Sequence, residues 1–445
     1  MGGLAGGAAG RAFMSGGWGS RVARGAYSLA LRLGSPAYLG KLLWRSRVEP
    51  PYRHALGERF GFYGKPVEPG ALWLHAVSLG ETRAAQALVD ALRAERPGLR
   101  LVLTNGTATG HEAGHAMLRD GDVQTWLPFD TPGATRRFFR HFRPSAGVLM
   151  ETEIWPNVLE AARGAGVPVV LANARLSEKS LRQGQRFGAV LGPAMASLRE
   201  ALAQTEADAA RLRTAGVRDA LVCGNLKFDM RIDPALLQRG QAWREALGRP
   251  VMLGTSTREG EEGGLIDAWK AQPADKRGLL LIVPRHPQRF DEVAQLVLAA
   301  GLTLARRSSW GDTPPEDALK ADVWLGDSMR EMPLYYGLAD VALLGGSFAP
   351  LGGQNLIEAA ACGCPVVMGP HTFNFAEAAE LSLAAGASQR ATDIVDGVAQ
   401  AVGLMAPGWR GPIAAKALAF AAAHQGAARR MAGRIAPLTD QRASS

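Results

Sequence analysis

A carboxylate at Glu81 is the first residue of this chain whose position suits chemistry. The apolar run Leu72–Val77 ends at Ser78, and an amphipathic helical pattern runs from Thr82 to Glu95. This order predicts a strand, a tight turn and a helix that carries Glu81 in its first turn. Because ligands bind at the carboxyl ends of parallel strands, Glu81 could accept a proton from a substrate there. Ser78-x-x-Glu81 also fits a capping box, in which Glu81 only satisfies a backbone N–H, and this segment alone leaves both roles open.

Three further charged residues follow predicted strands. Glu151 and Glu153 come directly after the strand 147–150, and Pro156 then opens a helix. Lys227, in the stretch GNLKFD, ends the last strand of the first half of the chain. Charged groups at such places are either solvated surface residues or parts of a site, and Lys227 could reach an anion.

The second half of the chain carries residues suited to an anion. The stretch Pro284-Arg285-His286-Pro287 fixes the backbone around a guanidinium, which suits a phosphate or a carboxylate. Glycines at 345–346 and 352–353 precede Asn355, a good N-cap for a helix. Such a helix start attracts negative charge through its free N–H groups and its dipole, so these glycines indicate a nucleotide site.

The elements that must position these residues alternate between strand and helix in two series. This alternation predicts a doubly wound α/β fold with two Rossmann-like domains facing a cleft. The break between the series falls within 229–250, and the Ala-rich stretch 412–435 is predicted as one long helix that packs back on the first domain. The predicted strands are 72–77, 99–104, 123–127, 147–150 and 167–171, then 251–254, 279–283, 302–305, 323–325, 341–344 and 366–368.

The composition of the 445 residues points to anionic partners. The net charge is +9 with 47% apolar residues, which suffices for sizeable cores. Nucleic acid is not expected, because the sequence has no zinc-finger spacing, RNP-like motif or basic heptad helix. The cysteines at 223, 362 and 364 suit a reducing compartment, and Cys362-x-Cys364 is interpreted as small-residue packing.

Residues 1–48 form a basic, aromatic and amphipathic segment with seven basic residues and no acidic one. No uninterrupted apolar run reaches the ~18 residues of a membrane-spanning helix, because Arg32 and Lys41 interrupt it. The segment therefore predicts a helix that lies in the membrane interface, with a disordered basic tail as the alternative. Met14 is a possible true start.

Ten stretches together match one known family. They are HAVSLGET, TNGTATG, METEIWPN, NARLSEKS, GNLKFD, GTSTREGEE, IVPRHPQRF, GDSMREM, GGSFAPLGGQNLIEAA and GPHTFNF. In these stretches the chain resembles the 3-deoxy-D-manno-octulosonic acid (Kdo) transferases of lipopolysaccharide assembly, which have the two-domain GT-B glycosyltransferase fold. The resemblance implies transfer of Kdo from CMP-Kdo to the 6′-hydroxyl of the lipid A precursor lipid IVA, with inversion. It also implies a protein at the cytoplasmic face of the inner membrane.

The resemblance also assigns roles to residues. Glu81 resembles the general base, and Glu151 and Lys227 resemble the stabilisers of the transition state. The donor site of the family matches Pro284 and Arg285, then Arg330, Glu331 and Met332, and finally Asn355, Leu356, Ile357 and Glu358. No cofactor is implied, and no metal is expected because the leaving group is a phosphate that basic side chains can stabilise.

Four regions follow from these expectations: a membrane-anchor region at 1–48, an acceptor-binding domain at 49–235, a CMP-sugar-binding domain at 236–411 and a C-terminal helix at 412–445. Two departures from the family stand near the donor site. Arg330 replaces a usual Gly, and Gln354-Asn355-Leu356 replaces His-Asn-Pro. The alternatives are another GT-B enzyme that uses a UDP-sugar, such as an epimerase or an N-acetylglucosaminyl transferase, and a non-catalytic binder of anionic lipid.

Overall fold

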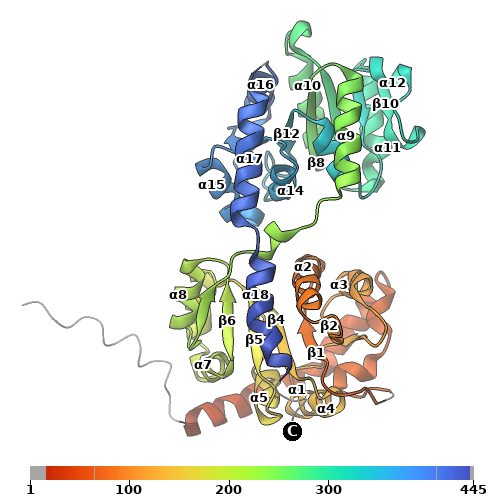
Figure 1. Cartoon of the computed structure of the whole chain (residues 1–445). Helices are drawn as coiled ribbons and strands as arrows, with labels where there is room; N and C mark the ends of the chain where they lie inside the picture. Colours follow the sequence, from red (N-terminus) through yellow and green to blue (C-terminus); the bar gives the residue numbers. More distant parts are fainter. Residues whose placement is uncertain (1–16, 65, 407, 441–445) are drawn as a thin grey trace, which may run out of the picture. The chain divides into compact units, whose positions relative to one another are not determined.

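The computed structural model describes residues 17–64, 66–406 and 408–440, which form two compact units (Figure 1). The first unit extends to Asp229 and takes up the chain again at Gln425, and the second comprises Met230–His424. The sequence predicts domain boundaries at 235/236 and 411/412. In the structure the chain enters the second unit slightly earlier, at Met230, and leaves it later, after His424. Met14 lies outside the described residues.

A seven-stranded parallel sheet forms the centre of the first unit. Its strand order is β3-β2-β1-β4-β5-β6-β7, so β1 has β2 on one side and β4 on the other. The strands are β1 (Leu72–His75), β2 (Leu101–Asn105), β3 (Val123–Trp126), β4 (Ala146–Met150), β5 (Val169–Ala174), β6 (Glu200–Ala203) and β7 (Ala220–Val222). The α-helices are α1 (Gly17–Arg45), α2 (Leu79–Glu95), α3 (Ala108–Gly114), α4 (Pro132–Phe142), α5 (Pro156–Gly164), α6 (Glu178–Gln185), α7 (Gly188–Ser197), α8 (Glu206–Thr214) and α18 (Ala427–Ile435). Short 3-10 turns are η2 (Pro50–Arg53), η3 (Leu56–Phe60), η4 (His115–Met117), η5 (Leu226–Asp229) and η10 (Ala436–Thr439).

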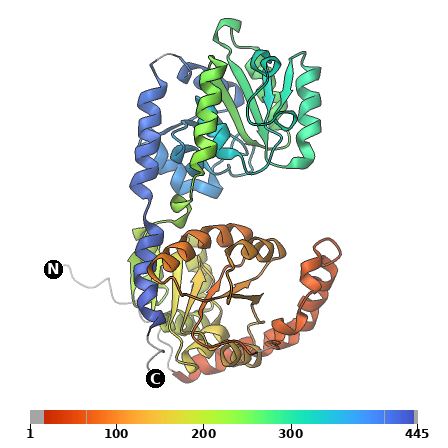
Figure 2. The same cartoon turned by 45° about the vertical axis from the view of Figure 1, so that its right-hand side comes forward.

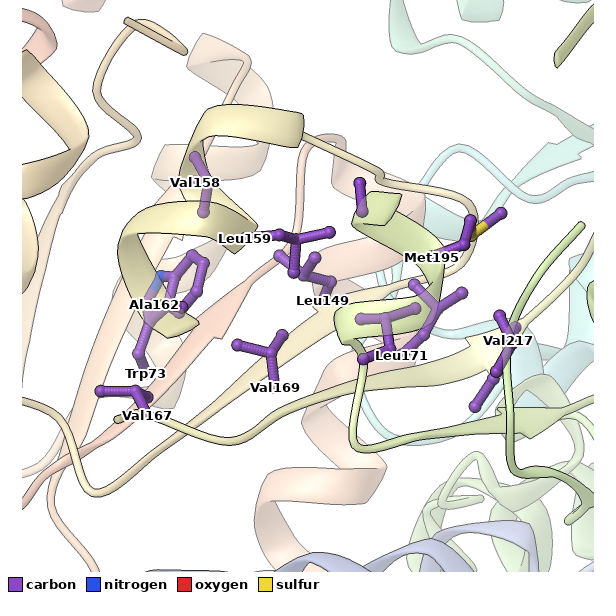
Figure 3. Packing of buried hydrophobic residues seen from close by; sticks show 14 of the residues in the cluster. Trp73, Leu149, Val158, Leu159, Ala162, Val167, Val169, Leu171, Met195 and Val217 are labelled. Carbon is purple, nitrogen blue, oxygen red and sulfur yellow. The ribbon is translucent and has the colours of Figure 1, made fainter. Parts of the chain in front are cut away.

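Alternate residues of these strands fill two separate cores, one on each face of the sheet. Trp73 and Leu149 point towards α4 and α5, where Val158 and Leu159 meet them (Figure 3). Their strand neighbours, such as Leu74, pack on the opposite face against α2 and α18. A parallel sheet covered on both faces explains why its strands are continuous apolar runs in the sequence.

The second unit repeats the design with another seven-stranded parallel sheet. Its strand order is β10-β11-β9-β8-β12-β13-β14, with β8 between β9 and β12. The strands are β8 (Val251–Thr257), β9 (Leu279–Pro284), β10 (Leu304–Arg306), β11 (Val323–Leu325), β12 (Val341–Leu344), β13 (Val366–Met368) and β14 (Ser388–Arg390). The α-helices are α9 (Pro234–Leu247), α10 (Glu261–Lys270), α11 (Phe290–Ala299), α12 (Glu316–Lys320), α13 (Met332–Leu338), α14 (Leu356–Ala361), α15 (Ala376–Ala384), α16 (Ile394–Leu404) and α17 (Arg410–His424). The 3-10 turns are η6 (Ala274–Lys276), η7 (Pro287–Arg289), η8 (Arg307–Ser309) and η9 (Phe373–Phe375).

The C-terminal stretch is two helices, and the prediction of one long helix is wrong. α17 ends at His424 in the second unit, and α18 begins at Ala427 in the first unit. Gly426 lies between them with φ +89°, a left-handed conformation that breaks a helix and that glycine adopts most easily. Two N–H groups at the start of α18, those of Gly426 and Ala428, donate to the carboxylate of Asp229. Figure 2 shows α18 on the first unit, where it contacts α2.

The basic N-terminal segment contains one long helix, α1, that packs on the first unit through a single face. Tyr27 donates a hydrogen bond to Asp130 (2.8 Å), and Ser28 donates to Asn157 (3.1 Å). The outer face exposes large apolar side chains, among them Trp18, Leu33 and Trp44. Among the described residues, no helix combines the length and the apolar character needed to cross a bilayer.

Candidate active site

The turn between β1 and α2 holds Glu81 at the edge where the strands of the first sheet end. Ser78 is the N-cap of α2, and its hydroxyl accepts a hydrogen bond from the Glu81 N–H (3.4 Å). The Glu81 carboxylate accepts from the Val77 N–H (2.7 Å) and from the Ser78 hydroxyl (3.1 Å). The cap interpretation is therefore confirmed, and the carboxylate stays partly exposed. These hydrogen bonds fix the position of Glu81, and its partial exposure still allows it to take part in a reaction.

Three carboxylates influence one another at this edge. Partial burial raises the pKa of Glu81, and the charge of Glu151 adds to the rise, whereas the Val77 N–H and the Ser78 hydroxyl oppose it. Partial burial and then the charges of Glu81 and Glu151 raise the pKa of Glu153 to about 7, against an opposing contribution from Trp155. β1 and β4 are neighbours, but the chain continues from β1 to β2 on one side of the pair and from β4 to β5 on the other. Ligands of α/β proteins bind at such a switch point in the strand order. Glu81 and Glu151 are thus brought together where the sequence predicts them, and Glu153 joins them.

The backbone at several strand ends is held in the left-handed region, which costs a non-glycine residue roughly 1–2 kcal/mol. Glu151 has φ +56°, and its N–H donates to the Ala172 carbonyl (2.9 Å). Asn173 (+52°) and Ser256 (+51°) are the penultimate residues of β5 and β8, and Arg330 (+66°) lies in the loop between β11 and α13. Strain of this kind gathers at functional sites, where the surrounding structure must hold it in place. Arg330, one of the predicted donor-site residues, thus adopts a backbone conformation that glycine takes more easily.

Lys227 is positioned by a chain of amide side chains at the same edge of the first sheet. It lies in η5, which contacts α2. Asn173 accepts from the Leu226 N–H (3.0 Å), and its carbonyl accepts from the Gln204 amide (3.0 Å). Asn225 donates to Gln204 (3.0 Å) and accepts from the Lys227 N–H (3.0 Å). Asn173 is fully buried and supports η5, a role that we did not predict from the motif NARLSEKS.

In the second unit, basic side chains gather where β8 and β9 end. Pro284 is the last residue of β9 and is buried, and the exposed Arg285 donates its N–H to the Thr257 carbonyl (3.0 Å). Burial, and then the charges of Arg258, Arg285 and Arg289, lower the pKa of His286, and the paired strands β8 and β9 place Arg258 and Arg285 directly after their ends. Arg258 was not among the predicted site residues. Its place in GTSTREGEE, directly after a strand, was the signal available.

A buried carboxylate, Glu261 at the start of α10, holds the glycine loop after β12. Both of its oxygens accept from the Gly346 N–H (2.9 and 2.8 Å), and one accepts from the Arg258 N–H (2.8 Å). A Cβ on Gly345 would lie 2.3 Å from the Ser256 carbonyl oxygen. The nucleotide site that these glycines indicate in the sequence stays a prediction. Gly345 allows two loops to approach closely, and the Gly346 N–H is occupied by protein.

The remaining predicted donor-site residues fall on two other helix starts. Glu331 accepts from Arg307 (2.8 Å) and from the Ser328 hydroxyl, whereas Arg330 is exposed and Met332 partly buried. Asn355 caps the six-residue helix α14 by accepting from the Ile357 N–H (3.1 Å), and Glu358 is partly buried. Leu356 and Ile357 have exposed fractions of 0% and 1%, so their side chains belong to the core and only their backbone groups can face a ligand.

Comparison with known proteins identifies the family. A family model described as 3-deoxy-D-manno-octulosonic-acid transferase matches residues 54–230. The 3-deoxy-D-manno-octulosonic acid transferase of Bordetella pertussis is 49% identical over 424 residues, which cover 92% of this chain and 98% of that protein. The chain belongs to the Kdo transferase family. The Haemophilus influenzae transferase is 36% identical over 360 residues, covering 79% of this chain and 83% of its own. Family membership makes the chain a glycosyltransferase.

Solved structures support the fold of this Kdo transferase family member. HepE of Anabaena in complex with UDP matches with a TM-score of 0.53 and 15% identity, covering 82% of this chain and 98% of its own. The UDP-GlcNAc 2-epimerase of Neisseria meningitidis bound to UDP-GlcNAc matches with a TM-score of 0.52 and 14% identity, covering 83% and 98%. At such identities the likeness concerns the fold alone, and it confirms the GT-B architecture of two parallel α/β domains.

Neither cysteines nor acidic residues form a metal centre in the described part of this transferase. All three cysteines are free and buried, in agreement with a packing role for Cys362 and Cys364. No group of three or more His, Cys, Asp or Glu among residues 17–64, 66–406 and 408–440 is arranged to hold a metal ion.

Proposed function

We propose that this protein transfers Kdo from CMP-Kdo to the 6′-hydroxyl of the lipid A precursor lipid IVA, with inversion at the anomeric carbon. The observation that carries the proposal is the partly buried carboxylate of Glu81, fixed by two hydrogen bonds at the switch point of the first sheet. Its family membership supplies the reaction class. A base with a raised pKa is suited to take a proton from a sugar hydroxyl near neutral pH.

The reaction follows from these groups. The acceptor oxygen forms a bond to the anomeric carbon of Kdo while the bond from that carbon to the phosphate oxygen breaks, and CMP leaves with the electron pair. The hydroxyl proton moves to Glu81. We assign Lys227 and Glu151, on η5 and after β4, to stabilising the charges that change in the transition state.

The donor site is assigned to the second unit. Arg285 and Arg258 supply positive charge at the ends of β9 and β8, where a departing cytidylate needs it. Hydrogen bonds to charged groups are worth roughly 1.5–3 kcal/mol each, so two guanidinium groups would stabilise the leaving phosphate considerably. Pro284, the segment 330–332 and the segment 355–358 complete the proposed site, with Leu356 and Ile357 contributing backbone groups only.

The place of action that we propose is the cytoplasmic face of the inner membrane. The outer face of α1 combines exposed Trp18, Leu33 and Trp44 with basic residues, a pattern typical of helices in the membrane interface. A groove of about 930 Å³ runs between α1, α4 and α5. The basic residues that line it, Arg21, Arg24, Arg32, Arg136, Arg140 and Arg143, suit the phosphates of an anionic lipid.

The test is a transfer assay with the Glu81→Gln variant. The parent protein, CMP-Kdo and a tetra-acylated lipid A precursor are incubated, and mass spectrometry measures the Kdo added to the lipid. We expect the variant to fold normally and to lose about 10²- to 10⁴-fold in rate, the usual contribution of a general base. The control is Glu178→Gln, an exposed carboxylate at the start of α6.

Two outcomes would contradict the proposal. If UDP-sugars raise the melting temperature of the protein and CMP-Kdo does not, it is a different GT-B enzyme. If Glu81→Gln transfers Kdo at the parental rate, Glu81 is a helix cap and not the base.

A further inference from the structure

A cavity of about 440 Å³ lies inside the first unit, between α1 and the ends of β1, β2 and β3. Its walls are mostly apolar, and α1 contributes Leu31, Tyr38 and Leu42 from one side. Leu127 and Phe129 line the opposite side, and the rings of Tyr38 and Phe129 meet edge to face with centroids 5.4 Å apart. The volume lies in the range of cavities that bind small molecules, about 300–1,000 Å³.

Two buried polar groups in the wall of this cavity are short of partners. Arg59 has an exposed fraction of 3%, and within the described part of the chain its Nε and Nη2 make no hydrogen bond. Its guanidinium stacks on the ring of Trp126 at 4.2 Å. His75 is fully buried, and its Nε2 likewise finds no partner, while Nδ1 contacts Thr104. A buried guanidinium without an acceptor is costly, so the cavity suits a ligand that brings oxygen atoms.

The acidic group in the wall does not fill that need. Asp130 lines the cavity, but its carboxylate accepts hydrogen bonds from the Tyr27 hydroxyl and from the N–H groups of Asn157 and Val158. These donors hold Asp130 to the start of α5 and to α1. Asp130 therefore does not supply the acceptors that Arg59 lacks.

The cavity also borders the residue that precedes the turn carrying Glu81. Val77 lines the cavity, and its N–H donates to the Glu81 carboxylate (2.7 Å). Gly106 and Thr107, whose N–H groups donate to the Val77 carbonyl, line the cavity as well. A chain bound here would therefore end beside the residue to which we assign proton transfer.

We propose that this cavity binds a fatty-acyl chain of the lipid acceptor, with the oxygen atoms at the head of that chain against Arg59. The proposal rests on the function proposed above, because it names the part of the acceptor that the first unit holds. A hydrocarbon chain matches the apolar walls, an oxygen-bearing head satisfies the guanidinium, and the position beside Glu81 presents the attached sugar to the base.

The chain offers a matched pair of variants on α1. Gly34 lines the cavity, and a Cβ built on it would meet no atom within 4 Å. Gly40 is equally free of neighbours but is not among the residues that line the cavity. Gly34→Phe should therefore fill the cavity without disturbing the fold, and Gly40→Phe places the same side chain on the same helix elsewhere.

The experiment is calorimetric titration of the full-length protein with alkyl phosphates of six to twelve carbons, below their micelle concentrations. If each added methylene group enters the cavity, affinity should rise about fourfold per methylene. Gly34→Phe should weaken the binding of dodecyl phosphate at least about fifteenfold, which corresponds to the loss of two buried methylene groups. Gly40→Phe should bind as the parent does, and equal affinities of the two variants would overturn the proposal.

A competition arm separates the two lipids that could supply such a chain. The tetra-acylated lipid A precursor should displace dodecyl phosphate from the parent protein, whereas vesicles of phosphatidylglycerol should not. Displacement by phosphatidylglycerol alone would assign the cavity to a bilayer lipid and overturn the proposal. Because neither arm needs Kdo transfer, their result is independent of the Glu81→Gln assay that tests the proposed function.

Discussion

Replacing Glu153 with Gln should stabilise the protein at alkaline pH and leave it unchanged at acidic pH. Partial burial and the charges of Glu81 and Glu151 raise the pKa of Glu153 from 4.5 to about 7 in the folded protein. A raised folded-state pKa stabilises the protein fully below pH 4.5, and this contribution is lost as the pH rises through 7. At one pKa unit per 1.36 kcal/mol, the rise of about 2.5 units corresponds to roughly 3 kcal/mol at pH 8.

Urea unfolding at pH 5, 6, 7 and 8, followed by tryptophan fluorescence, measures this difference. The free energy of unfolding of the parent should fall relative to Glu153→Gln over that range, with most of the divergence between pH 5 and 7. Glu178→Gln, in which an exposed carboxylate of the same unit is replaced, should follow the parent at every pH. If the curves of the parent and Glu153→Gln run parallel, the three carboxylates at the ends of β1 and β4 do not interact as described.

Three further predictions concern the site and the packing of each unit. Glu151→Gln removes a charge that raises the pKa of Glu81, so the acid limb of the pH profile of kcat/KM for Kdo transfer should move to lower pH. If the limb does not move, the charge of Glu151 does not act on Glu81. Gly240→Ala places a Cβ 2.0 Å from a carbonyl oxygen of α13 and should cost about 1–3 kcal/mol in thermal unfolding, whereas Gly263→Ala on α10, with open space around it, should not destabilise. Asp229→Ala removes the acceptor at the start of α18 and should lower the free energy of unfolding by about 1 kcal/mol in urea; no change would show that α18 is held by its apolar face alone.

Most strands of the two sheets could be predicted from the sequence, because parallel strands that are covered on both faces are continuous apolar runs. Three strands have no counterpart among the predicted ranges: β6, β14 and β7 (Ala220–Val222), of which only β7 was implied, by the place of Lys227 at the end of a strand. β6 is Glu200-Ala201-Leu202-Ala203, whose residues favour helix, and only its place between β5 and β7 makes it a strand. β14, with Ser388 and Arg390 at its ends, is a three-residue edge strand without an apolar run.

The candidate site could be predicted only in part. The place of Glu81 followed from the order of strand, turn and helix, because this local pattern is complete within ten residues. The raised pKa of Glu153 could not be predicted, since it depends on charges at the end of another strand. The same holds for Arg258, which lies near Arg285 only because β8 and β9 are neighbours. The contact between Gly346 and Glu261 could not be predicted either, because the two residues are 85 positions apart in the sequence.

The return of the chain to the first unit has a consequence for its biogenesis. Met431, Ala432 and Ile435 of α18 belong to the same core as Leu74 and Leu88, near the other end of the polypeptide. While a ribosome is still translating, this core lacks its last helix, and one face of the first sheet keeps apolar side chains in contact with water. Domains usually fold in the order of their synthesis, but here the second unit is complete before the first. The nascent first unit therefore lacks part of its core until α18 has left the exit tunnel.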